Sequence, residues 1–330
     1  MHSIHPRDSE RFLLRQLCER RLPERFPDLH FVTQSFTPSI IENGIERTAC
    51  EILRAMRRDR RSVFVILHEY ATALDFGEHI VFTPHVVAGM AESFIPIAYL
   101  PYNCCDDPPP MDERPLLASF RGSAATDPTG TRQRVITALG GEADCVAEDT
   151  DRFHDWHDKA QQRANASRYR ELLAASRISI CPRGAGVATF RFWEALASGS
   201  VPLLVADGLR LPLARIIDWD TISLRLGESD VDQLPAFLAS QSIPRLAEMA
   251  ALGRRIWDEW FAPERWYAAI EEELARPREL FPSPRPCRNA RNTKSSFGER
   301  AGEGQRSGRM HRQRLACGQE MQNAERRMQN

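Results

Sequence analysis

The chain has 330 residues, of which 42% are hydrophobic and 27% are charged, with a net charge of −1 at pH 7. This composition is typical of a globular protein that is long enough to bury a core in each of two domains. A net charge near zero gives no overall field that would attract nucleic acid, so we expect no nucleic-acid partner. The eight cysteines include no CxxC pair, which argues against a zinc site and against a disulfide framework.

The first part of the chain predicts an N-terminal α/β unit over residues 1–113. Residues 1–29 are charged and mostly irregular, apart from a short amphipathic helix. The hydrophobic pattern then alternates between strand and helix periods. The expected elements are a helix at 10–21, a strand at 30–33, a helix at 43–56 and strands at 62–67, 79–82 and 95–100. Residues 104–115 are Pro-rich and acidic, which predicts a linker.

The pattern that follows predicts a second α/β unit over residues 114–275. Strand and helix signals alternate regularly, which favours a parallel, doubly wound sheet. Helices at the end of the unit close the domain. The expected elements are strands at 116–120, 143–147, 177–181 and 201–205, helices at 131–139, 156–175 and from 188, and closing helices at 231–239, 244–260 and 263–275.

The remaining residues, 276–330, predict a basic and disordered tail. They contain 13 Lys and Arg against 5 Asp and Glu, a net charge of +8. Few of them are aliphatic, so burial could not offset the entropy of ordering them. The alternative is a basic arm that contacts anionic lipid or polysaccharide.

The segment from Ser176 to Leu211 carries the clearest chemistry. A short strand stops at Pro182, a turn with Gly184 and Gly186 follows, and a helix then leads to a second buried strand. In a parallel sheet, such a turn places the helix N-terminus at the carboxyl edge. Free backbone N–H groups, the positive helix end and Arg183 together suit a phosphate group.

The same segment resembles the C-terminal signature of exostosin-like glycosyltransferases over residues 176–219. The spaced pattern comprises Ser176, Cys181, Pro182, Arg183, Gly184, Gly186, Thr189, Arg191, Glu194, Ala195, Leu196, Gly199 and Pro202, followed by Leu211, Pro212, Ile217, Asp218 and Trp219. The resemblance implies a GT-B fold of two Rossmann-like lobes. It also implies transfer of a sugar from a nucleotide-sugar, typically a UDP-sugar, to a glycan or another hydroxyl acceptor, with inversion and without a metal or other cofactor.

Arg183 is the first candidate to bind the donor diphosphate, and a surface salt bridge is its alternative role. Gly184 and Gly186 suit both phosphate approach and a tight turn, so they do not discriminate between these roles. Thr189 can cap the helix, contact phosphate or do both. Arg191 is left open between contact with phosphate and a structural pairing within the protein.

Two further parts of the second unit are expected to contact the nucleotide-sugar. Arg121 and Gly122 end its first strand, from which the arginine can reach the diphosphate. By the resemblance, Glu194 accepts hydrogen bonds from the ribose hydroxyls, whereas an ordinary solvated glutamate is the alternative.

An inverting transferase also needs a group that takes the acceptor proton. The loop after the strand at 62–67 resembles the acidic strand-end loop of the family. Its candidates are Glu69 first, then Asp75 and then His68, and an ordinary solvated loop is the alternative.

No acidic pair stands at a strand end near the signature, which favours a metal-free site. No stretch reaches 18 apolar residues, so we expect a cytoplasmic, bacterial-type enzyme, with peripheral contact to the inner membrane only through the basic tail. The oligomeric state stays open. Two rival functions remain: an inactive sugar- or nucleotide-binding scaffold, and a dinucleotide-dependent oxidoreductase that uses Gly184, Gly186 and Asp207.

Overall fold

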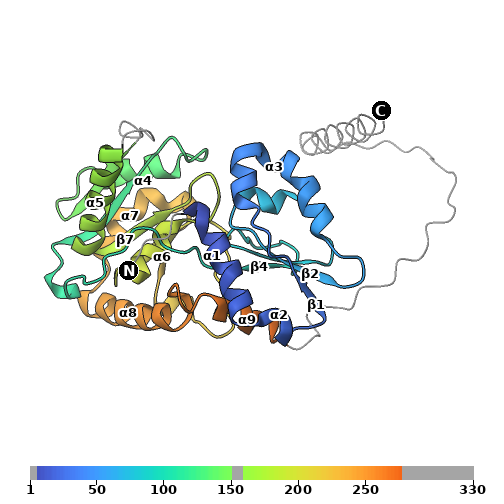
Figure 1. Cartoon of the computed structure of the whole chain (residues 1–330). Helices are drawn as coiled ribbons and strands as arrows, with labels where there is room; N and C mark the ends of the chain where they lie inside the picture. The colour runs from blue at the N-terminus through green and yellow to red at the C-terminus, as the bar shows by residue number, and fades with distance from the viewer. Residues whose placement is uncertain (1–5, 151–158, 277–330) are drawn as a thin grey trace, which may run out of the picture. The chain divides into compact units, whose positions relative to one another are not determined.

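The computed structural model describes residues 6–150 and 159–276, and these form two parallel β-sheets with helices packed against them (Figure 1). The predicted α/β class with two Rossmann-like units is confirmed. The predicted tail at 276–330 lies outside the described residues except for Arg276, and the predicted helix at 156–175 is described only from residue 159.

The first sheet contains four strands in the order β1-β2-β3-β4, each parallel to its neighbour. Its strands β2 and β3 are apolar on both faces, as expected for a sheet covered on both sides. Val63 and Val65 pack into a cluster with α1, whereas Phe64 packs into a second cluster with α3. The elements are α1 (Pro6–Glu19), α2 (Leu22–Arg25), β1 (Leu29–Phe31), α3 (Thr37–Ala55), β2 (Arg61–Val65), the 3₁₀ helix η1 (Glu69–Ala73), β3 (Ile80–Thr83) and β4 (Phe94–Pro96).

The second sheet contains five parallel strands in the order β6-β5-β7-β8-β9. The chain runs from β5 outward to β6, then returns to β7 on the other side of β5, so the winding direction reverses between β5 and β7. In open α/β sheets, ligands bind at the carboxyl ends of the strands where this reversal occurs. The elements are β5 (Leu116–Gly122), α4 (Thr131–Leu139), β6 (Cys145–Asp149), α5 (Lys159–Ala175), β7 (Ser176–Pro182), α6 (Phe190–Ala197), β8 (Val201–Val205) and β9 (Leu224–Arg225).

Helices after β9 complete the second unit and return to the first. They are α7 (Leu234–Ala239), α8 (Ile243–Ile256), a π-helical turn (Trp257–Phe261) and α9 (Tyr267–Leu274). Just before α9, the indole N–H of Trp266 donates to the carbonyl of Ala98 at 3.0 Å. The side chain of Gln16 in α1 donates to the carbonyl of Pro263 at 2.6 Å. The chain end thus packs against α1 and the segment after β4.

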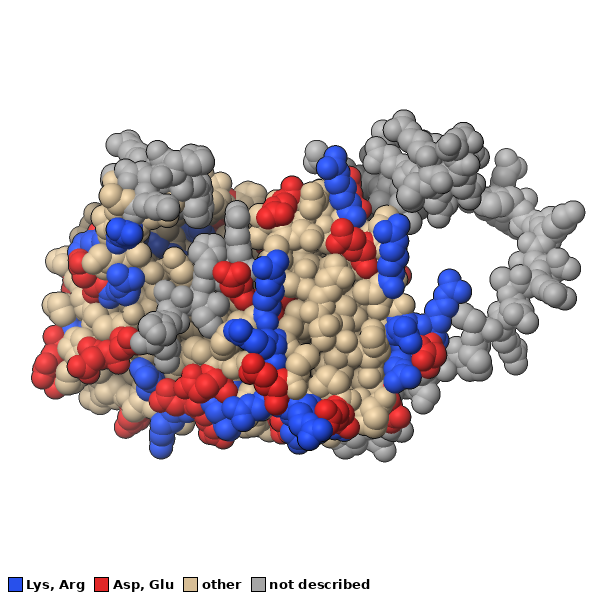
Figure 2. All heavy atoms as spheres, viewed as in Figure 1, with Lys and Arg blue, Asp and Glu red and all other residues tan. Residues whose placement is uncertain are grey.

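The helices and one face of the surface show the membrane-spanning capacity and the charge pattern of the described part of the chain. Within residues 6–150 and 159–276, no helix is both long and apolar enough to cross a membrane. On the face shown in Figure 2, Lys and Arg alternate with Asp and Glu along the lower edge, over α8 and α9. Alternating charges of this kind give no continuous basic surface there.

Candidate functional site

The turn between β7 and α6 lies at the carboxyl edge of the second sheet, beside the point where the winding reverses. The N–H of Arg183 donates to the carbonyl of Val205 at 3.0 Å, and the N–H of Gly184 donates to the carbonyl of Gly186 at 3.0 Å. These bonds close a compact loop that ends at Thr189, where α6 begins. The predicted strand, glycine turn and helix therefore have the expected order and place.

Side chains from other elements lie against both glycines of this turn. A Cβ atom at position 184 would lie 2.6 Å from Nη2 of Arg132, and one at position 186 would lie 2.4 Å from Cε1 of His85 and 3.0 Å from Cβ of Glu69. Neither glycine has a positive φ angle. Close approach by a neighbour, rather than backbone conformation, therefore requires glycine at these two positions.

Arg183 lies at the turn with a carboxylate near its guanidinium. Its Nη1 is 3.7 Å from Oε1 of Glu228, and its side chain is 21% exposed. Its Nε is buried and donates no hydrogen bond within the described residues. Glu228 also accepts hydrogen bonds from the amide of Asp207 and from the hydroxyl of Thr131. The Arg183 side chain is therefore only loosely paired, which is compatible with anion binding.

Arg121 and Arg191 are more firmly engaged. The guanidinium of Arg121 forms an ion pair with Glu148 and donates to Asn165 at 2.8 Å. Arg191 donates to the backbone carbonyl of Arg121 and lies over the ring of Phe120, 4.6 Å from its centroid. Arg191 thus has the structural partners that the sequence left open, and phosphate contact by either arginine stays a prediction.

Gly122 and Thr189 both lie close to this edge. A Cβ atom at Gly122 would lie 2.8 Å from Nη2 of Arg191, so glycine here makes room for that guanidinium. Thr189 is the residue that precedes the first turn of α6, but its side chain makes no capping hydrogen bond. The capping role predicted for the Thr189 hydroxyl is therefore not observed, and phosphate contact stays a prediction.

Glu194 is buried within the protein rather than solvated. One carboxylate oxygen accepts from the amides of Tyr102 and Asn103, at 3.3 and 2.8 Å, and the other accepts from the hydroxyl of Tyr169 at 2.7 Å. Burial raises the pKa of Glu194, and the hydrogen bonds from Tyr169 and the amides oppose this shift. In this structure Glu194 connects α6 to α5 and to the segment after β4. A ribose contact would require the carboxylate to exchange one of these donors.

Two loops of the first sheet meet the glycine turn, the loop after β2 through Glu69 and the loop after β3 through His85. His85 is buried, and burial lowers its pKa to about 3, with a smaller contribution from His68. The Nδ1 atom of His85 lies 3.4 Å from the amide N of Ala188, and Nε2 lies 2.5 Å from the hydroxyl of Tyr99. We assign the neutral tautomer in which Nδ1 accepts from Ala188 and Nε2–H donates to Tyr99, because this arrangement satisfies both neighbours.

The three candidate bases lie in different surroundings. An oxygen of Glu69 is 3.4 Å from Nδ1 of His68, and the Glu69 side chain is 29% exposed. Asp75 is exposed and accepts a hydrogen bond from the amide of Gly77, a local turn contact. The structure therefore brings Glu69 and His68 together near the glycine turn, whereas no contact places Asp75 there.

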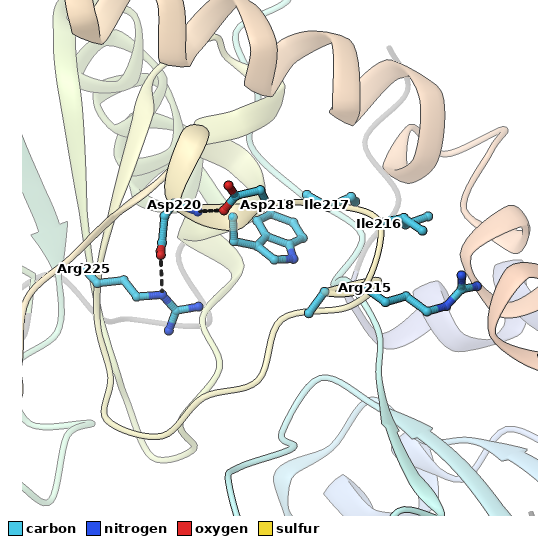
Figure 3. Close-up of a pocket in the computed structure, with 8 residues that line it drawn as sticks. Arg215, Ile216, Ile217, Asp218, Asp220 and Arg225 are labelled. Carbon is cyan, nitrogen blue, oxygen red and sulfur yellow. Dashed lines mark hydrogen bonds and ion pairs between the residues drawn. The ribbon is translucent and has the colours of Figure 1, made fainter. Parts of the chain in front are cut away.

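Two surface hollows lie away from the glycine turn. One, of about 510 Å³, is lined by residues 214–220 and Arg225 (Figure 3). The other, of about 560 Å³, lies between the segment 109–114 and helix α8. Neither is lined by a candidate site residue. Among the residues that the structure describes, no group of three His, Cys, Asp or Glu side chains is placed to hold a metal ion.

The sequence interpretation did not identify His85, Tyr99 or Arg132. His85 follows the third strand of the first sheet closely, so its position at a carboxyl edge was a usable signal. Tyr99 lies in a predicted strand and gave no such signal. Arg132 lies in the first turn of α4, the helix that follows the strand of Arg121. Its contact with Gly184 joins distant parts of the sequence, so no local pattern predicts it.

Part of the chain is similar to a known protein family. Residues 87–241 match the family model described as the exostosin GT47 domain. That range contains the entire glycine turn and α6. The family resemblance that the sequence predicted is therefore confirmed over these residues.

The curated relatives are longer proteins from animals. An Exostosin-1 homolog of Caenorhabditis elegans is 32% identical over 156 residues, which cover 44% of this chain and 41% of that protein. Exostosin-1b of Danio rerio is 26% identical over 196 residues, which cover 57% of this chain and 26% of that protein. The chain thus spans less than half the length of these relatives, and they give no support to the expected bacterial source.

Among solved structures, Anabaena Alr3699/HepE in complex with UDP-glucose is similar to this chain at 12% sequence identity and a TM-score of 0.41. The match covers 78% of this chain and 81% of that chain. At this identity and TM-score, the similarity supports no conclusion about the activity or ligands of this chain.

Proposed function

We propose, from the premise that residues 87–241 form an exostosin-like domain, that this chain is a glycosyltransferase. It moves a sugar from a nucleotide-sugar, most readily a UDP-sugar, to a hydroxyl group of a glycan acceptor. Transfer proceeds with inversion, and the protein's own side chains and amides take the place of a metal at the diphosphate.

The contact between Glu69 and Gly186 carries this proposal. Glu69 comes from the loop after β2 in the first sheet, and Gly186 comes from the turn after β7 in the second. The Cβ atom of Glu69 lies 3.0 Å from the position that a Cβ atom would occupy at Gly186. The base of the Glu69 side chain thus lies against a turn suited to a diphosphate, and its carboxylate is the nearest candidate base to that turn.

Inversion assigns a role to each side of this contact. The acceptor oxygen attacks the anomeric carbon opposite the leaving nucleoside diphosphate, and Glu69 takes the proton of that hydroxyl. The bond between the anomeric carbon and the diphosphate oxygen breaks, and both its electrons stay on that oxygen. The turn amides, the N-terminus of α6 and Arg183 then stabilise the developing negative charge.

His68 and His85 support this arrangement without taking the proton themselves. Nδ1 of His68 lies 3.4 Å from a carboxylate oxygen of Glu69. His85 stays neutral and accepts from the amide of Ala188, so it adds no positive charge beside Glu69.

The test is a screen of the full chain for hydrolysis or transfer with UDP-sugars and GDP-sugars, joined to calorimetric titration with UDP and with NAD(P). We expect UDP to bind and one or more nucleotide-sugars to be consumed. Binding of UDP without turnover under any acceptor would favour the scaffold, whereas binding of NAD(P) in its place would favour the oxidoreductase.

A further inference from the structure

Arg132 spans the point at which the second sheet reverses its winding. Its Nε donates to the carbonyl of Arg183 at 2.8 Å, in the loop that leaves β7. Its Nη1 donates to the carbonyl of Ser123 at 2.9 Å and to the hydroxyl of Thr126 at 2.7 Å, in the loop that leaves β5. One planar guanidinium thus joins the two loops that border the proposed diphosphate site.

The backbone that carries Arg132 is itself held in place. Asp127 accepts from the amides of Thr129 and Arg132, both at 2.9 Å, and from the Thr129 hydroxyl at 2.6 Å. Burial raises the pKa of Asp127, but these hydrogen bonds outweigh burial and hold the pKa below its ordinary value. The start of α4 is therefore held by hydrogen bonds to Asp127, and the Arg132 side chain leaves it towards the two loops.

We propose that Arg132 is a positioning residue that sets the distance between the β5 loop and the β7 loop, and with it the fit of the donor diphosphate. This inference rests on the proposed function. Arg132 acts through the backbone of Arg183 and Gly184. The same arrangement explains why residue 184 is a glycine. A Cβ atom at this position would lie 2.6 Å from Nη2 of Arg132.

The shape of the guanidinium matters as much as its charge. Arginine presents donors in a rigid plane and can hold two carbonyl groups at once, whereas the single ammonium of lysine cannot span them. Arg132→Lys therefore keeps the positive charge but removes the bridge. This substitution separates positioning from a simple electrostatic effect.

The first test compares the affinities of UDP and UMP, measured by calorimetry on the full chain. In Arg132→Gln and in Arg132→Lys, we expect the preference for UDP over UMP to fall about tenfold, because only UDP places a β-phosphate between the two loops. Arg134→Gln is the matched control, since Arg134 in the same helix bonds the carbonyls of Glu228 and Ser229 instead. An unchanged UDP preference in Arg132→Lys, or an equal loss in the control, would overturn the proposal.

The second test needs no nucleotide and so separates this inference from the proposed function. We expect Gly184→Ala to lower the melting temperature in the wild-type background and to cost much less in an Arg132→Ala background. Additive losses would mean that Arg132 does not constrain the turn, and would overturn the proposal. The two proposals can also fail separately. If the wild type binds neither UDP nor UMP, but Arg132→Ala still reduces the loss of melting temperature caused by Gly184→Ala, the proposed function is refuted while the contact between Arg132 and Gly184 stands.

Discussion

Arg183 and Arg177 lie at opposite ends of β7, and only Arg183 is at the carboxyl edge. Arg177 donates to the carbonyls of Met111 and Asp112. We expect Arg183→Ala to weaken UDP binding by about 1.5–3 kcal/mol, the range of a hydrogen bond to a charged group. Arg177→Ala should leave the affinity unchanged. Titration calorimetry measures both, and equal affinities for the two variants would remove Arg183 from the site.

His85 makes protein stability depend on pH. Its pKa lies near 6.5 in an unfolded chain and falls to about 3 when the residue is buried. Because the unfolded chain binds the proton more readily, this contribution to stability is complete above about pH 6.5 and is lost as the pH falls towards 3. We expect the unfolding free energy of wild type to fall between pH 6 and 4 more steeply than that of His85→Gln, by up to ~1.4 kcal/mol per pH unit. Denaturant titrations at several pH values measure the slopes, and parallel slopes would refute a buried neutral imidazole.

Helix α1 holds the start of α3 and the segment just after β2 through one carboxylate. Glu10 is fully buried and accepts from the amides of Phe36, Thr37 and Leu67 and from the Thr37 hydroxyl. Glu10→Ala would leave several buried donors unsatisfied, so we expect a loss of roughly 3 kcal/mol or more. Glu19→Ala, on the exposed part of the same helix, is the control and should change stability by less than about 0.5 kcal/mol. A similar melting temperature for both variants would contradict this role of α1.

The strands and helices of the second unit could be predicted because each has its own local pattern. Residues 177–181 and 201–205 are short apolar runs, and both are strands in the structure. Predictions were poorer where tertiary contacts decide the conformation. The helix expected at 43–56 begins at Thr37 and contains a kink at Gly44, where φ is 79°. The strand expected at 95–100 ends at Pro96 in the structure, and further along the chain the amides of Tyr102 and Asn103 donate to Glu194.

The location of the site was predictable, but the partners of its side chains were not. The glycine turn follows a strand and precedes a helix, which is a local signal. The ion pair of Arg121 with Glu148 and the contact of Arg132 with Gly184 join residues 27 and 52 positions apart in the sequence. Such contacts depend on the order of the strands, which cannot be read from the local pattern of a single sequence.

Arg276, the last residue that the structure describes, forms an ion pair after α9. Arg276 pairs with Glu273, a buried residue whose pKa is raised by burial and lowered in part by Arg276. From the composition of residues 277–330, we expect a chain that ends at Arg276 to keep the melting temperature and any transferase activity. Thermal denaturation and a donor-consumption assay test this. A fall of several degrees would mean that the removed residues stabilise the rest.

The placement of Glu69 beside the glycine turn makes the most direct test a comparison of Glu69→Gln with Asp75→Asn. Glutamine keeps the size of Glu69 but cannot accept the acceptor proton, so turnover should fall by about 10²–10⁴ while UDP affinity is unchanged. Asp75→Asn should turn over normally, because Asp75 makes only a local contact with Gly77. The measurement is steady-state consumption of the nucleotide-sugar, with UDP affinity determined on the same samples. Full activity of Glu69→Gln, or loss of activity in Asp75→Asn alone, would contradict a base at Glu69.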